Sequence, residues 1–192
     1  MDWQTLQDSC LACNNCGLCN QRTQVVFGVG PQDAEILFVG EGPGQQEDLQ
    51  GEPFVGAAGH FLDDMLSIIG LGRHNCYITN IVKCRPPQNR DPLPEEQQAC
   101  MPWLRTQTKL LRPKIIVCLG RIAAMKLIRD DFKITREHGQ WTEKGGIWFT
   151  ALYHPSALLR DESKRPETFR DLKQLRAKIL SCSDYPERYT LD

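Results

Sequence analysis

The sequence lacks any apolar run near the roughly 18 residues that a membrane-spanning helix needs. Its start, MDWQTLQDSC, has neither the basic cap nor the apolar segment of an export signal. Net charge is also nearly absent, because 23 Lys and Arg residues face 24 Asp and Glu residues. We therefore expect a cytoplasmic protein with no membrane partner, folded as a single domain over residues 1–192. Any contact with nucleic acid must come from a local basic face.

Cysteine, in contrast, is abundant, with nine residues in 192. A reducing cytosol keeps cysteines out of structural disulfides, so metal binding is the leading explanation. The run CLACNNCGLC places cysteines at 10, 13, 16 and 19, a spacing that brings sulfurs to one metal or cluster. A ferredoxin-type run would continue with CxxxCP, which is missing, so Cys84 and Cys100 are candidates for distant ligands. Zinc held by four cysteines is the alternative.

Strand-like and helix-like segments alternate along the chain. The strand-like ones are short, apolar and rich in β-branched residues; they lie at 35–40, 76–81, 114–120 and 147–153. Segments with apolar residues near helical spacing lie at 60–70, 94–111, 120–130 and 166–180. This alternation predicts an α/β fold with a parallel sheet covered on both faces.

Three polar residues stand at the predicted carboxyl ends of strands: Glu41, Asn80 and His154. Ligands of open α/β sheets bind at these ends, because the connecting loops diverge there. Pro155 favours an extended conformation for His154, so its ring should project from the sheet. Each residue alone has an equally good structural explanation, but together they predict a shared pocket.

The segment GEGPGQQED resembles a dinucleotide-binding turn but fails on spacing. The GxGxxG fingerprint requires glycine where this chain has Gln45, and Pro43 interrupts the turn that should open a helix. With Glu47 and Asp48 expected to be exposed, the turn is a poor phosphate cradle and better suits a neutral planar ligand. Phe54 could stack on such a ligand, although a loop aromatic more often packs on the core.

The ordered motifs GEGPGQQED, EPFVGAAG, YITNIVKCRPPQNR and HPSALLR, together with the cysteines, resemble family 4 uracil-DNA glycosylases, the iron-sulfur branch of that superfamily. The likeness extends from about Cys13 to Lys178. It implies a three-layer α/β/α sandwich with a short central parallel sheet. It also implies a monomeric DNA-repair enzyme that flips uracil out of single- or double-stranded DNA and hydrolyses its N-glycosidic bond, leaving an abasic site.

The resemblance also implies a 4Fe-4S cluster with a structural role. Its ligands would be Cys13, Cys16, Cys84 and Cys100, with Cys10 and Cys19 left as extras.

The same resemblance assigns the pocket. The backbone from Gly40 through Glu41 to Gly42 would contact uracil, Phe54 would stack on it, Asn80 would read O4 and N3, and His154 would bond O2. The best-known branch of the superfamily has an aspartate where this chain has Gly42. Glu41 and Glu47 are therefore the candidates for activating water, and Glu47 could instead exclude the methyl group of thymine.

DNA contacts are expected from residues 160–178, where seven basic residues face four acidic ones. Leu158 or Leu159 could wedge into the gap left by a flipped base, with Arg160 on a phosphate.

Two rival functions remain. The first is a non-enzymatic protein of a related branch that traps uracil-DNA covalently through a histidine in an insertion; the loop 85–99 contains no histidine, which argues against this function. The second is an iron-sulfur electron carrier or redox sensor, which would leave Asn80 unexplained.

Overall fold

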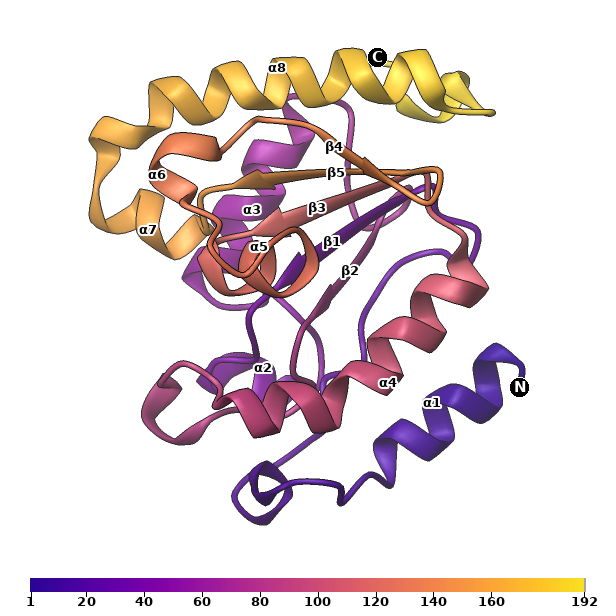
Figure 1. Ribbon diagram of the computed structural model, residues 1–192, viewed down its shortest axis with the longest axis vertical. Helices are drawn as coiled ribbons and strands as arrows, with labels where there is room; N and C mark the ends of the chain where they lie inside the picture. Colours follow the sequence, from indigo (N-terminus) through magenta and orange to yellow (C-terminus); the bar gives the residue numbers. More distant parts are fainter. Residues whose placement is uncertain (192) are drawn as a thin grey trace.

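A computed structural model describes residues 1–191 of the chain and contains a five-stranded sheet in the order β2-β1-β3-β5-β4 (Figure 1). The first four of these strands are mutually parallel, and β4 runs antiparallel to β5 at one edge. Gly145 and Gly146 form the β4–β5 turn with positive φ angles of 58° and 82°. The strands are β1 Ile36–Gly40, β2 Tyr77–Asn80, β3 Ile115–Leu119, β4 Thr142–Lys144 and β5 Ile147–Leu152.

Helices cover both faces of the sheet, with α8 along one side and α4 and α1 along the other (Figure 1). The α-helices are α1 Trp3–Leu11, α2 Gln45–Gln50, α3 Ala57–Ser67, α4 Pro94–Leu111, α5 Arg121–Leu127, α6 Ile134–Glu137, α7 Pro155–Arg160 and α8 Arg165–Cys182. Short 3-10 helices are η1 Gly17–Asn20, η2 Pro87–Asn89, η3 Glu162–Lys164 and η4 Pro186–Tyr189. Within residues 1–191, no helix is both long and apolar enough to cross a bilayer.

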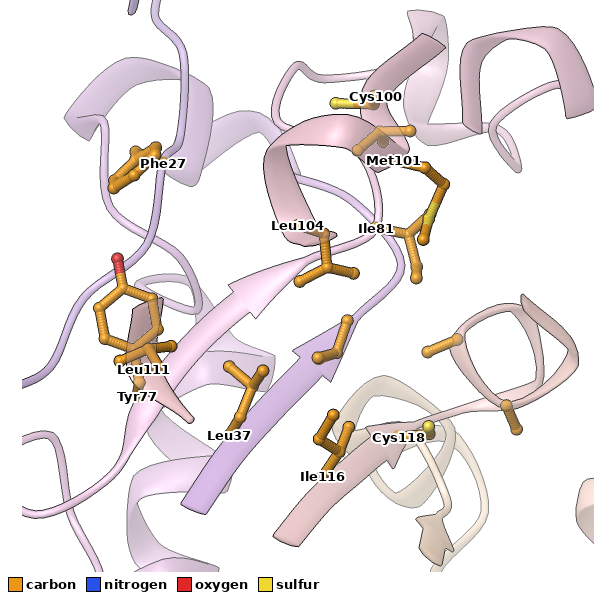
Figure 2. Close-up of a cluster of buried hydrophobic side chains, with 14 of the residues drawn as sticks. Phe27, Leu37, Tyr77, Ile81, Cys100, Met101, Leu104, Leu111, Ile116 and Cys118 are labelled. Atoms are coloured by element: carbon orange, nitrogen blue, oxygen red, sulfur yellow. The ribbon is translucent and has the colours of Figure 1, made fainter. Parts of the chain in front are cut away.

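Strand side chains alternate between two buried clusters. In β1, Leu37 and Val39 pack with α1, α4 and α5, whereas Ile36 and Phe38 pack with α3, α7 and α8. Figure 2 shows Leu104 and Leu111 of α4 in the first cluster, beside side chains of the sheet. This period of two follows from the pleat of a strand, and it explains why the central strands are apolar at every position.

The structure confirms the predicted α/β class and the four predicted strands and helices, with small shifts at their ends. It adds β4, which is exposed and polar and therefore carries no apolar signal. It also adds α2, although Pro43 was expected to prevent a helix there. The helix begins at Gln45, two residues beyond the proline, where Gly44 adopts the extended conformation of an N-cap.

Candidate active site

The parallel strands β1, β2 and β5 end at a cavity of about 580 Å³. Glu41, Asn80 and His154 all line it, so the structure brings together the three polar residues expected at strand ends. Gly42, Glu47 and Phe54 line it too.

Asn80, the last residue of β2, is 2% exposed, and its Oδ1 has no hydrogen-bond partner within the described chain. A buried acceptor without a partner is costly, so a ligand that donates to it would bind favourably. Gly40 makes this arrangement possible. A Cβ at Gly40 would lie 2.4 Å from Asn80 Oδ1 and 2.6 Å from Phe54 Cζ, so a side chain there would displace both.

The position of the Phe54 ring depends on the backbone conformation of this residue. Its φ of 55° lies in the left-handed region, which is unusual for a bulky residue. Arg73 donates to the carbonyl of Pro53 at 2.8 Å and also to that of Phe54. Gly59 is required by the close packing of this turn, because a Cβ there would lie 1.8 Å from the Phe54 oxygen. The Phe54 ring lies 5.7 Å from the ring of His154, so the two rings form adjacent walls of the cavity.

His154 is the N-cap of α7, and this position fixes its tautomer. The backbone N–H of Ser156 donates to His154 Nδ1 at 3.1 Å, and Ser156 Oγ lies 2.7 Å from the same nitrogen. Burial, together with the nearby Arg160, lowers the pKa of His154 to about 4, so the ring is neutral at physiological pH. Because Nδ1 accepts, the single ring proton resides on Nε2, which is therefore a hydrogen-bond donor.

The Glu47 carboxylate joins two loops around the cavity. Oε1 accepts from the backbone N–H groups of Val55 and Gly56 at 2.9 and 3.0 Å, and Oε2 accepts from Gly44 at 3.1 Å. The neighbouring Asp48 is 4% exposed and accepts from the Thr23 amide at 2.9 Å. The expectation that both carboxylates are exposed is wrong, because each satisfies loop amides.

Glu41 is the most strongly perturbed carboxyl group of the cavity. Burial, and then the nearby carboxylate of Asp91, raise its pKa to about 7, while Arg121 opposes the shift. Arg121 forms an ion pair with Asp91 at the rim. Asp91, Arg121 and Ser156 were not predicted from the sequence, because polar residues in loops and at helix starts carry no periodic signal.

Six cysteines line a second, small cavity beside α1 and α4: Cys10, Cys13, Cys16, Cys19, Cys84 and Cys100. Three sulfurs already accept hydrogen bonds from polar groups. Trp103 Nε1 lies 3.3 Å from Cys13 Sγ, an Arg22 guanidinium nitrogen lies 3.3 Å from Cys84 Sγ, and the Lys83 amide lies 3.2 Å from Cys100 Sγ. Donors aimed at sulfur stabilise thiolates, the form that binds metal.

The donor set is cysteine, which suits either a zinc ion or an iron-sulfur cluster. In the described part of the chain, no three His, Cys, Asp or Glu side chains converge closely enough to hold one metal ion. The six sulfurs line one common cavity, and either group would take four of them.

The residues expected to contact DNA separate into two kinds. Leu158 is 1% exposed and packs in the core, so of the two leucines expected as a wedge only Leu159 stays a candidate. Its neighbour Leu159 is 41% exposed, and Arg160 lies at the cavity. Helical geometry explains the difference, because successive residues point about 100° apart and only one can face the core.

Comparison with known proteins defines the class. Residues 27–177 match the family model of the uracil DNA glycosylase superfamily. A type-4 uracil-DNA glycosylase of Archaeoglobus fulgidus is 46% identical over 86% of this chain and 87% of its own length. One of Sulfurisphaera tokodaii is 41% identical over 98% and 88%. A type-5 enzyme of Thermus thermophilus is 34% identical over 68% of each chain. This chain belongs to the type-4 uracil-DNA glycosylase family of that superfamily.

Proposed function

We propose that this protein is a DNA-repair glycosylase that hydrolyses the N-glycosidic bond between uracil and deoxyribose, leaving an abasic site. The observation that carries this proposal is the unpartnered Oδ1 of Asn80 in the cavity at the strand ends. Uracil presents an N3 donor beside an O4 acceptor, and a carboxamide matches both. Oδ1 accepts from N3, and Nδ2 donates to O4.

The rest of the cavity suits a flat, neutral base. Phe54 offers an aromatic face for stacking, and Gly40 and Gly42 let the backbone approach the ring closely. A base inside a duplex cannot reach this cavity, so the nucleotide must flip out at a cost of a few kcal/mol. Leu159 fills the gap that the base leaves, and Arg160 binds a phosphate.

His154 stabilises the leaving group. As the glycosidic bond breaks, uracil departs with negative charge on O2, and the Nε2–H of a neutral imidazole donates to that oxygen. Because the pKa of His154 is about 4, this donor is present throughout the physiological range. A preorganised donor of this kind contributes about 10²- to 10³-fold in rate.

Glu41 is the better of the two candidates for activating water. The oxygens of Glu47 already accept three backbone N–H bonds, which suits Glu47 to holding the loops in place. Glu41 carries a pKa of about 7 at the cavity wall, close to the value that favours a general base near neutral pH. Glu41 therefore orients and deprotonates the water that attacks the sugar.

Cys13, Cys16, Cys84 and Cys100 would hold a 4Fe-4S cluster. When bound, it supplies a covalent cross-link between distant segments of the chain. Cys84 and Cys100 flank the loop 85–99, and Asn89, Arg90 and Asp91 of this loop line the uracil cavity. Ligation therefore fixes one wall of the active site. Cys10 packs in the core beside Leu6, which accounts for it without a ligand role.

A labelled single strand with one uracil tests the proposal. Incubation followed by alkali should give one break at the uracil position, and matched strands with thymine or cytosine should stay intact. A denaturing gel run without alkali separates the rival functions. A covalent trap would shift the DNA to a slower band together with the protein. A redox protein would give neither this shift nor the alkali-dependent break. An iron-loaded preparation that leaves the uracil strand intact would refute the proposal.

The cytoplasmic location, the monomeric state and the single domain remain predictions.

A further inference from the structure

Lys83 lies between the two cavities and is 1% exposed. Its Nζ donates to Thr79 Oγ1 at 2.5 Å and to the backbone carbonyl of Asn80 at 3.0 Å. The ammonium thus closes the turn that follows β2, directly behind the residue proposed to read uracil. A buried ammonium is strongly disfavoured unless hydrogen bonds and an opposite charge compensate it.

No carboxylate in the described chain lies within ion-pair distance of Lys83. Instead, Lys83 lines the cysteine cavity, and its own amide donates to Cys100 Sγ at 3.2 Å. Lys83 therefore contacts both sites, because its amide reaches the Cys100 sulfur and its Nζ reaches the Asn80 carbonyl.

The turn that Lys83 closes also holds the end of β1. The amide of Ile81 donates to the carbonyl of Gly40 at 2.9 Å, and the amide of Val82 donates to that of Glu41 at 3.2 Å. Glu41 lines the cavity proposed to bind uracil, and Gly40 precedes it as the last residue of β1. A change at Lys83 therefore reaches Asn80 through a direct hydrogen bond, and it reaches Gly40 and Glu41 through the amides of the same turn.

We propose that Lys83 is a positioning residue that couples the cysteine-bound cluster to uracil recognition. Its backbone amide donates to Cys100 Sγ on one side, and its Nζ holds the Asn80 turn on the other. This role rests on the proposed function and extends it, because the cluster then affects base recognition as well as the cross-linking of the chain. Loss of the cluster frees the Cys100 sulfur that the Lys83 amide contacts, and the turn behind Asn80 loosens.

Lys83→Met tests the coupling, with Lys109→Met as a control that removes the same charge from an exposed position on α4. Three quantities are measured: the half-life of cluster absorbance in a chelator, the inhibition constant of free uracil, and the affinity for uracil-free DNA. We expect Lys83→Met to weaken uracil inhibition about tenfold, as for a lost buried hydrogen bond, and to shorten the cluster half-life. DNA affinity stays unchanged, and Lys109→Met matches the wild type in all three.

Hydrogen exchange on the wild-type protein gives a second measurement that needs no variant. After the cluster is stripped, the amides of Ile81 and Val82 should lose protection, whereas β3 keeps it. Unchanged protection at 79–83 after stripping, or wild-type uracil inhibition in a folded Lys83→Met protein, would overturn the coupling. Wild-type cleavage of uracil-DNA is assayed in parallel. If the wild type is active and only the coupling results fail, the inference falls and the proposed function stands.

Discussion

Replacing His154 by alanine removes the donor proposed for uracil O2 and should slow turnover about 10²- to 10³-fold, or about 2.7 to 4 kcal/mol of transition-state stabilisation. The structure supports this magnitude, because two contacts from Ser156 hold the ring and leave the proton on Nε2. Affinity for uracil-free DNA should stay unchanged, since the ring lies inside the cavity. Single-turnover excision on a uracil strand gives the rate, and fluorescence anisotropy gives the affinity.

Ser156→Ala is the matched control. It removes the hydroxyl beside Nδ1 but keeps the backbone N–H that fixes the tautomer, so its loss should stay within about tenfold, as for one neutral hydrogen bond. Because the pKa of His154 is about 4, the wild-type rate should show no His154 titration near 6.5, its ordinary value. Equal losses of turnover and DNA affinity in His154→Ala would show that the ring only positions DNA. Full activity would remove His154 from the mechanism.

Substitutions at four further positions give testable results. If ionised Glu41 activates water, excision should rise with pH through about 7, and Glu41→Gln should be slow and lack this rise. The pKa of Glu41 in the folded protein lies above its ordinary value of 4.5, so the stability that protonated Glu41 contributes is lost as pH rises through about 7. The melting temperature of Glu41→Gln should therefore exceed that of the wild type at about pH 8, but not at a pH below 4.5. Asn80→Asp should lose most uracil activity and gain weak release of cytosine at acidic pH, because a protonated carboxyl can donate to N3 while its other oxygen accepts from N4; wild-type uracil activity would show that Asn80 does not read the base. Cys84→Ala should lower iron below about four per chain and give poorly soluble protein, whereas Cys118→Ala, in the core of β3, should keep its iron; equal iron in both would exclude Cys84 as a ligand. Leu159→Ala should reduce excision from double strands more than from single strands, and an equal effect on both would exclude a wedge.

The strand ends show what the sequence alone could establish. Short apolar runs revealed the parallel strands, and the rule that ligands bind at their carboxyl ends placed Glu41, Asn80 and His154 in one pocket. Those three residues do line one cavity. The inference needed no side-chain detail, because the direction of parallel strands determines which loops meet.

Other parts of the site depend on contacts that no local pattern encodes. Glu47 was a candidate for chemistry, but its bonds to Val55 and Gly56 are visible only once the two loops are adjacent. Leu158 and Leu159 are identical in type, and only the packing of α7, chiefly against α3, decides which is buried. Asp91 lies in a proline-rich loop without periodicity, so its effect on Glu41 could not be predicted.

The order of residues after β2 explains how two unlike sites share one support. Asn80 ends the strand, Lys83 closes the following turn, and Cys84 comes next. The residue proposed to read the base and a proposed cluster ligand are therefore separated by a single turn of backbone. A turn this short transmits any displacement of the sulfur to the carboxamide, because its amides are bonded to the end of β1. A pocket whose polar atoms must match the edge of one base needs such rigidity, since an error near 1 Å costs a hydrogen bond. The cysteine site therefore stands where it can stabilise the geometry on which base recognition depends.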